Sequence, residues 1–263
     1  MLDTIQKLYH GWKEIMIPKK IHYFWFGYNE KPKEVISYIN TWKRYFPEYE
    51  IIEWNETNFD INCCKYTKQA YEAKKYAFVS DYARIYVLYY IGGIYFDTDM
   101  EVCKSFENLL ENRKMVLGFE DEHYIMTAFM AAEAGLECFS KLLKEYQSKS
   151  FINKSGGYDT LPNPVIVTEI MKNYLIPNGK HQTFQTNCEV YPYDYFSAFH
   201  IARQKLNVTE NTVCIHHCMG TWQTKKDRIK PWIKSRIIMF IGEKSFETIK
   251  NILVNKGKKS DYN

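Results

Sequence analysis

The chain carries two aspartates two residues apart, Asp97 and Asp99, directly after the apolar run Ile94-Tyr95-Phe96. Each carboxylate raises the free energy of ionising the other, and a divalent cation removes that cost. Mg²⁺ and Mn²⁺ prefer oxygen ligands and commonly share them between one or two protein carboxylates and substrate phosphates. The pair therefore predicts a site where Mn²⁺ or Mg²⁺ holds a diphosphate. A pair of loop aspartates facing water is the simpler alternative.

The segments before this pair predict that it lies at the edge of a sheet. Apolar residues recur at helical spacing from residue 66 to 90, as one helix or as two with a restart at Ser80-Asp81. Gly92-Gly93 then ends the helix, and residues 94–96 form a buried strand. Because open α/β sheets bind ligands at the carboxyl ends of their strands, the two aspartates stand where a ligand would bind.

An α/β pattern surrounds this segment. Residues 21–26 and 49–54 read as strands with a helix over 34–45 between them, which Pro47 ends, so a parallel strand pair is expected. A short helix at 1–16 leads the chain. Further expected elements are strands at 115–119 and 213–217, helices at 128–146 and 164–174, and a loop at 153–164. The predicted fold is α/β, with one mostly parallel sheet flanked by helices.

Three separated motifs resemble one known family. Ser80-Asp81-Tyr82-Ala83-Arg84 followed by Gly92-Gly93-Ile94-Tyr95-Phe96-Asp97-Thr98-Asp99 resembles the signature of glycosyltransferase family 32, the DXD-containing sugar transferases. The run from Ile17 to Gly27 resembles the family's first strand, and His216-His217-Cys218-Met219-Gly220-Thr221-Trp222 resembles its C-terminal element. The family includes bacterial capsular polysaccharide enzymes and the yeast initiating α-1,6-mannosyltransferase, and it is distantly similar to the clostridial glucosylating toxins. The resemblance covers residues 17–222 and implies a GT-A-type fold.

The resemblance implies a role for each matched acid. Asp99 would be the direct metal ligand, and Asp97 would reach hydroxyl groups of the donor's ribose or sugar. Asp81 and Arg84 lie three residues apart, share one helix face, and would bracket the sugar hydroxyls and the leaving phosphate. Without the neighbouring motifs, an ordinary intrahelical ion pair is the better interpretation of that spacing.

The two outer motifs imply the rest of the site. Trp25, with Phe24 beside it, would form a wall for the donor's base, or Trp25 is a core residue. Trp222 would donate its indole N–H to the β-phosphate. His217 would complete the metal ligands beside Asp99. His216 is the alternative, because neighbouring strand residues face opposite sides.

Two further features of the sequence bear on the site. Cys214, His216, His217 and Cys218 lack the separated second ligand pair of a structural zinc site, so zinc is not expected. Segment 124–132 departs from the family, because Thr127 and Ala128 stand where relatives often have an Asn-containing loop. We expect this segment and the loop at Gly156-Gly157 to contact the acceptor or the sugar.

The charge and the cysteine content of the chain limit which binding partners and which cell compartment are expected. A formal charge of +4 over 263 residues gives no reason to expect a nucleic-acid partner. Positive charge gathers in residues 225–259, which form either basic helices that touch an anionic membrane or a solvated helix pair packed on the sheet. An odd number of cysteines, the absence of a C-x-x-C pair and the absence of a signal peptide favour a reducing cytoplasm. No apolar stretch is long enough to span a membrane.

Together these patterns predict a GT-A-type glycosyltransferase domain over residues 1–223 and a basic helical extension over 224–263. The expected activity is that of a retaining, metal-dependent hexosyltransferase. Its donor is a nucleotide-sugar, UDP-hexose favoured and GDP-mannose second, and its acceptor is a glycan or lipid-linked oligosaccharide of surface polysaccharide synthesis. We expect it in the cytoplasm, and peripheral contact at the inner face of the membrane is one of the two alternatives for its basic tail. The alternatives are a non-catalytic nucleotide-sugar binding module, a toxin-like transferase that modifies a protein, and a phosphatase or other metal hydrolase.

Overall fold

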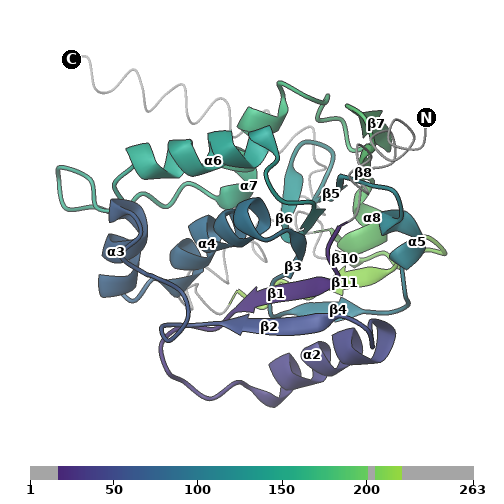
Figure 1. Ribbon diagram of the computed structural model, residues 1–263, viewed down its shortest axis with the longest axis horizontal. Coiled ribbons are helices and arrows are strands. Elements are labelled where there is room, and N and C mark those ends of the chain that lie inside the picture. The colour runs from purple at the N-terminus through teal and green to yellow at the C-terminus, as the bar shows by residue number, and fades with distance from the viewer. Residues whose placement is uncertain (1–16, 201–204, 221–263) are drawn as a thin grey trace, which may run out of the picture.

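The computed structural model describes residues 17–200 and 205–220 of the chain (Figure 1). A seven-stranded sheet has the order β2-β1-β3-β6-β5-β8-β7, and the pairs β10-β9 and β11-β4 form two small sheets. The strands are β1 (Lys20–Phe24), β2 (Glu50–Trp54), β3 (Gly93–Phe96), β4 (Met100–Val102), β5 (Met115–Phe119), β6 (Ile125–Ala132), β7 (Gln182–Phe184), β8 (Cys188–Tyr191), β9 (Phe199–His200), β10 (Lys205–Leu206) and β11 (Cys214–His216). The helices are α2 (Lys33–Tyr45), α3 (Lys65–Glu72), α4 (Tyr76–Tyr90), α5 (Glu107–Leu110), α6 (Glu137–Ser148), α7 (Asn163–Met171) and α8 (Tyr193–Phe196).

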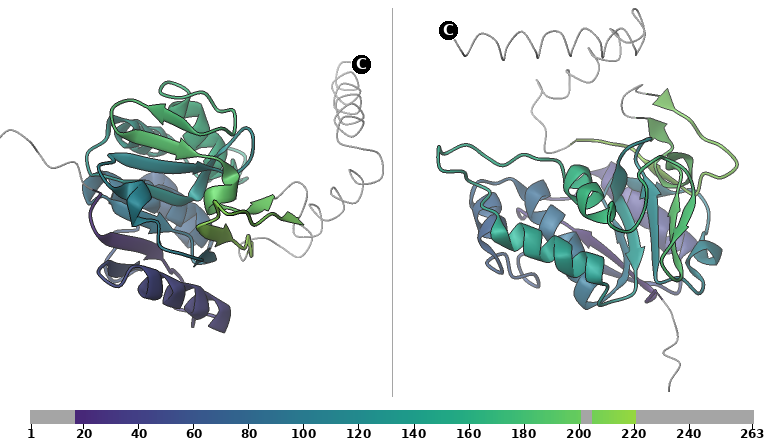
Figure 2. Two further views of the ribbon diagram at one scale, coloured as in Figure 1. Left: turned by 90° about the vertical axis from the view of Figure 1, so that its right-hand side faces the viewer. Right: turned by 90° about the horizontal axis from the view of Figure 1, so that it is seen from above.

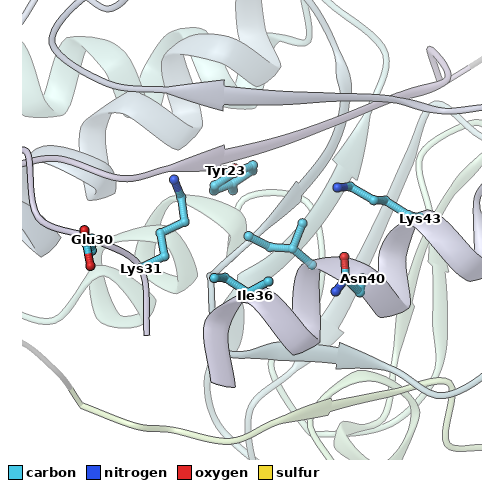
Figure 3. A pocket seen from close by; sticks show the side chains of 7 residues that line it. Tyr23, Glu30, Lys31, Ile36, Asn40 and Lys43 are labelled. Carbon is cyan, nitrogen blue, oxygen red and sulfur yellow. The ribbon is translucent and has the colours of Figure 1, made fainter. Parts of the chain in front are cut away.

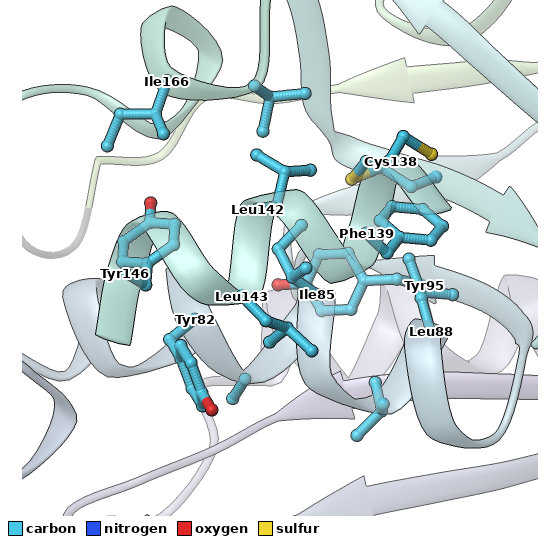
Figure 4. Packing of buried hydrophobic residues seen from close by; sticks show 14 of the residues in the cluster. Tyr82, Ile85, Leu88, Tyr95, Cys138, Phe139, Leu142, Leu143, Tyr146 and Ile166 are labelled. Atoms are coloured by element: carbon cyan, nitrogen blue, oxygen red, sulfur yellow. The ribbon is translucent and has the colours of Figure 1, made fainter. Parts of the chain in front are cut away.

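Helices cover both faces of the large sheet (Figures 1 and 2). Helices α3, α4, α6 and α7 share one buried cluster with the sheet, and Figure 4 shows the side chains of α4 and α6 meeting within it. Helices α2, α5 and α8 contribute to a second cluster on the other face. Strands β1, β2, β3, β5 and β8 run in one direction, and β6 and β7 run the opposite way. The predicted α/β fold, a mostly parallel sheet flanked by helices, is confirmed.

Strand β1 pairs in parallel with both β2 and β3, as the predicted strand–helix–strand unit requires. His22 of β1 is fully buried beside both neighbouring strands. Trp54 Nε1 donates to His22 Nδ1 (3.0 Å), so Nε2 carries the proton and donates to Gly92 O (2.8 Å). Burial lowers the pKa of His22 to about 4. His22 is therefore a neutral core residue that links β1 to its neighbours.

The helical stretch before β3 is two helices, α3 and α4. The break lies at residues 73–75, where Lys74 adopts a φ of 57°. Ser80 and Asp81 lie inside α4, so the restart predicted there is misplaced. The actual start of α4 has no side-chain cap, which explains why no capping signal marks it in the sequence.

The helix predicted over residues 128–146 is wrong in its first part. Residues Ile125–Ala132 form strand β6, and α6 begins only at Glu137. Every residue of β6 is buried, because this strand lies between β3 and β5 with helices over both faces. A strand buried on both faces shows no alternation of apolar and polar residues, so its sequence resembles that of a buried helix.

Several predictions concern residues outside the described part of the chain. They are the leading helix at 1–16, the role of Trp222, the domain boundary at 223 and the basic extension at 224–263, and they stay predictions. None of the described helices combines the length and apolar character that a membrane crossing requires. All seven cysteines are free thiols.

Strand β3 approaches β1 so closely that Gly93 has no room for a side chain. Its φ is +114°, and a Cβ on Gly93 would lie 2.7 Å from Lys20 O and 3.1 Å from His22 Nε2. Gly93→Ala should therefore lower the free energy of unfolding by about 3 kcal/mol, as measured by urea denaturation. Gly135→Ala is the matched control, because Gly135 has a φ of +83° but no atom within 4 Å of its added Cβ. The control should lose only about 1 kcal/mol. Equal losses would contradict the close approach of the two strands.

Candidate active site

The two aspartates follow β3 at the carboxyl edge of the sheet, as predicted. Asp97 N donates to Ala128 O of β6 (2.8 Å), and Met100 N donates to Asp97 O (3.0 Å). Residues 97–100 therefore form a tight turn between β3 and β4. The turn leaves both carboxylates partly accessible, with 28% of the Asp97 side chain and 15% of the Asp99 side chain exposed.

A histidine from the far end of the described chain joins this turn. Strand β11 pairs antiparallel with β4 and places His216 opposite Met100. His216 Nε2 lies 3.3 Å from Asp99 Oδ1, and Met219 N donates to Asp99 Oδ2 (2.8 Å). Ligand atoms of Asp97, Asp99 and His216 all lie within 4.8 Å of one another. Across residues 17–200 and 205–220, these three side chains, which we call the acidic corner, form the one group able to hold a metal ion.

The acidic corner favours a charged Asp99–His216 pair. Burial opposes charge on either group, but the Asp99 carboxylate raises the pKa of His216 well above its usual range. Against the same effect of burial, His216 and the Met219 N–H hold the pKa of Asp99 below its usual value. A metal ion that takes His216 as a ligand must displace its proton, so metal affinity should fall at low pH.

His217 faces away from the acidic corner. Its ring Nε2 lies 2.8 Å from Glu101 Oε2, and the ring stacks on Tyr38 with centroids 4.5 Å apart. Neighbouring strand residues point to opposite sides, so only one of the two histidines can lie against Asp99. The structure brings His216 there, which is the alternative that the sequence left open.

Arg84 connects the residues predicted to hold the donor. Its guanidinium lies 3.0 Å from Asp81 Oδ1 and 3.2 Å from Asp97 Oδ1, and only 5% of its side chain is exposed. It also donates to Thr127 O (2.7 Å) and lies over the Tyr95 ring, 4.6 Å from the centroid. The Tyr95 hydroxyl donates to Asp97 Oδ1. Asp81 and Arg84 thus share a helix face, as expected, and through Arg84 that face of α4 is bonded to β3 and β6.

Asp81 is almost fully buried within this network. Burial raises its pKa to about 7, with Arg84 opposing the shift and Asp97 adding to it. Arg84 occupies Oδ1 of both Asp81 and Asp97, and within the described residues no hydrogen bond engages Oδ2 of either acid. These two oxygen atoms are therefore left to accept hydrogen bonds from a ligand.

Glu120 joins the site without having been predicted. It follows β5 directly, as Asp97 follows β3, and its N–H donates to Tyr124 O (2.8 Å) in the connection to β6. Burial raises the pKa of Glu120 to about 7, with His216 opposing the shift and Asp121 and Asp97 adding to it. Its carboxyl group therefore lies in the electrostatic field of the acidic corner. An acid directly after an apolar strand was the available signal.

The two rings of the predicted base wall lie on different faces of the sheet. Phe24 is 5% exposed and packs in the core against Phe26 and Trp54, so its proposed contact with a base is wrong. Side chains alternate along β1, and Trp25 belongs to the opposite face. Trp25 is half-buried, and its Nε1 donates to Asn29 O (2.7 Å). Of the two rings, Trp25 alone retains an accessible surface for a base.

The segments predicted to contact the acceptor differ in their positions. Segment 124–132 is largely β6 and reaches Arg84 through Thr127 O. Gly156-Gly157 lie in an exposed turn closed by Asn153 N, which donates to Gly157 O (2.8 Å). A cleft of about 450 Å³ lies elsewhere and holds no residue of the acidic corner. Figure 3 shows its lining: Tyr23, Glu30, Lys31, Ile36, Ile39, Asn40 and Lys43.

Comparison with known proteins gives the class of the chain. Residues 32–116 match the family model described as "Glycosyltransferase sugar-binding region containing DXD motif". This range includes Asp81, Arg84, Asp97 and Asp99. With these residues inside the matched segment and gathered around Arg84 and the acidic corner, the chain is a glycosyltransferase with a DXD-containing sugar-binding region.

Comparisons with curated proteins and with solved structures give weaker similarities. The search of curated proteins finds no match. Among solved structures, the PaToxG glycosyltransferase is 20% identical, with 65% of this chain and 74% of that chain covered and a TM-score of 0.47. A glycosyltransferase involved in the glycosylation of the major capsid of PBCV-1 is 11% identical, with 80% and 97% covered and a TM-score of 0.43. At these TM-scores neither likeness bears on function.

Glu120 should make stability fall as pH rises. Its pKa is about 7 in the folded chain against an ordinary value of 4.5, so the folded state binds this proton more tightly than the unfolded state. Between those two pH values, rising pH should remove up to about 3 kcal/mol of unfolding free energy. Glu120→Gln cannot titrate and should make this part of the stability curve less steep, with the remaining slope coming from Asp81, whose pKa is also raised to about 7. The curve is measured by urea denaturation with a metal chelator present. Glu137→Gln, at a carboxylate that is 71% exposed, should keep the wild-type slope. An unchanged slope in Glu120→Gln would contradict the raised pKa of this acid.

Proposed function

We propose that the chain is a retaining, metal-dependent hexosyltransferase. Its donor would be a nucleotide-sugar, UDP-hexose in preference to GDP-mannose, and its acceptor a glycan of surface polysaccharide or oligosaccharide synthesis. The observation that carries this proposal is the convergence of Asp97, Asp99 and His216 within 4.8 Å at the carboxyl edge of the sheet. Two of the three lie inside the DXD-containing sugar-binding region.

The donor atoms of the acidic corner suit Mn²⁺ better than Mg²⁺. Mg²⁺ keeps to oxygen ligands, whereas His216 offers an imidazole nitrogen that a transition metal accepts more readily. Asp99 and His216 would hold the ion, and oxygen atoms of the diphosphate would complete its shell. When bound, the ion supplies positive charge that stabilises the departing nucleoside diphosphate.

The Arg84 network suits the sugar side of the donor. Arg84 fixes Oδ1 of Asp81 and of Asp97, so their Oδ2 atoms can accept hydrogen bonds from the transferred sugar and the ribose. Because burial raises the pKa of Asp81 to about 7, this acid is present near neutral pH in both protonation states. It can therefore accept a hydrogen bond from a sugar hydroxyl or donate one.

The base and the leaving phosphate have one proposed contact each. The partly exposed ring of Trp25 would stack on the base, which suits uracil and guanine alike, so the preference for UDP rests on the resemblance. Trp222, outside the described residues, would donate its indole N–H to the β-phosphate. Both assignments come from the motifs that these residues occupy.

Retention would follow from attack on the face that the leaving group departs from. The anomeric carbon loses its bond to phosphate oxygen and gains one to the acceptor oxygen, whose proton passes to the phosphate. In this proposal Asp81 and Asp97, paired with Arg84 through Oδ1, use Oδ2 to accept hydrogen bonds from the sugar, and Asp99 is paired with His216, so none of the three is assigned the role of covalent nucleophile. Glu120, with a pKa of about 7, is partly neutral near that pH, which makes it a weak nucleophile but a suitable partner for the acceptor hydroxyl.

The acceptor's location is proposed from charge. Residues 225–259 concentrate positive charge. An anionic membrane surface attracts such segments, and a lipid-linked oligosaccharide would be presented there. We therefore propose a cytoplasmic enzyme that makes peripheral contact with the inner face of the membrane.

Calorimetric titration tests the proposed function directly. Wild-type protein should bind one of UDP-glucose, UDP-galactose, UDP-N-acetylglucosamine or GDP-mannose in the presence of Mn²⁺ and bind it weakly without the ion. Asp99→Asn removes a metal ligand and should weaken that binding by about tenfold or more. Asp60→Asn, at an exposed loop aspartate whose Oδ1 accepts from Asn62 N (2.9 Å), should behave as wild type. Failure of the wild type to bind any donor with Mn²⁺ present would overturn the proposal.

A further inference from the structure

Residues 216–219 make the contacts that orient Asp99. His216 Nε2 lies 3.3 Å from Asp99 Oδ1, and Met219 N donates to Asp99 Oδ2 (2.8 Å). Between them, His217 N donates to Asp99 O (3.0 Å). The β-sheet hydrogen bonds of this segment are those between β11 and β4, each a strand of three residues. A two-stranded sheet this short is only marginally stable, so the segment needs further support.

The ring of His217 adds to the support that the segment already has from His216 N, which donates to Ser197 O (2.9 Å). Its Nε2 lies 2.8 Å from Glu101 Oε2, within hydrogen-bond distance of that carboxylate. Tyr38 covers the ring in a stacked arrangement, with centroids 4.5 Å apart and planes at 16°. The ring is thus held at one edge by a carboxylate and on one face by an aromatic side chain.

Tyr38 is itself held in place, because α2 is bonded to β4. Trp42 Nε1 donates to Met100 O (2.7 Å), and Val102 N donates to Thr41 Oγ1 (3.0 Å). Tyr38, Thr41 and Trp42 lie at positions i, i+3 and i+4 and so share one face of α2. This helix therefore provides a fixed base under β4 and β11.

We propose that Tyr38 and Glu101 are positioning residues of the acidic corner, acting through the ring of His217. Together these three residues form what we call the clasp. The side chains of Tyr38 and Glu101 both contact the ring of His217. By holding that ring, they keep residues 216–219 where His216 and Met219 contact Asp99. This proposal rests on the proposed function in one respect, which is that the acidic corner binds a metal ion.

Amide hydrogen exchange tests the clasp without metal or donor. Glu101→Gln and Tyr38→Leu should each raise the exchange rate of residues 216–220 by about tenfold, because the His217 ring loses one of the two side-chain contacts that hold it. Glu53→Gln changes a partly buried carboxylate that accepts from the Tyr23 hydroxyl (2.6 Å), and Tyr45→Leu changes another half-buried tyrosine of α2. Both controls should leave this exchange rate unchanged. If the clasp variants also leave it unchanged, the proposal is overturned.

Mn²⁺ affinity then separates the clasp from the negative charge of Glu101 acting at a distance. Each clasp variant should raise the calorimetric Kd for Mn²⁺ by about tenfold. In a His217→Ala background the same substitutions should change the Kd no further, since both act through that ring. A further loss from Glu101→Gln in that background would show a direct charge effect and refute the clasp. If the wild type binds no Mn²⁺, the proposed function fails, while the exchange result still decides whether the clasp exists.

Discussion

Arg84 carries a full positive charge into the interior, with only 5% of its side chain exposed. A buried ion is tolerated only where acceptors surround it, and removing one partner of such a group typically costs about 3–5 kcal/mol. Here the acceptors are Asp81, Asp97 and the carbonyl of Thr127, with the Tyr95 ring against the guanidinium. These groups come from α4, β3 and β6, so the ion holds three elements in one arrangement. The sugar-binding oxygens that we propose depend on that arrangement.

The acidic corner is built on a different principle. Asp99 contacts His216 and Met219, which lie near the C-terminal end of the described chain. The small β4–β11 sheet, and not the seven-stranded sheet, brings these residues to Asp99. Helix α2 supports that small sheet from one side, through Trp42 and Thr41. Two rigid supports, α4 with its buried arginine and α2 with its bonds to β4, thus meet at the turn between β3 and β4. A site that orients a sugar for transfer benefits from such fixed surroundings.

Patterns that mark a residue by its immediate neighbours predict the site better than patterns that depend on packing, as the helix expected over 128–146 shows, because its first part is strand β6. Asp97 and Asp99 follow a glycine pair and a short apolar strand, and Asp81 and Arg84 have helical spacing, so their positions needed only local information. Phe24 was misplaced because β1 is apolar on both faces, which hides the phase of its alternation. The same alternation left His216 and His217 undecided until β11 was paired with β4. Glu120 was missed because one acid after a strand is not a motif; only the neighbouring elements make it part of a site.

Asp99 and His216 are proposed to hold a divalent cation at the carboxyl edge of the sheet. Pulsed electron paramagnetic resonance on Mn²⁺ added to the protein measures this directly, because a coordinated imidazole nitrogen couples to the metal's electron spin. We expect nitrogen coupling in the wild type and in His217→Ala, and its loss in His216→Ala. Loss of the coupling in His217→Ala with retention in His216→Ala, or no nitrogen coupling in the wild type, would contradict this proposal.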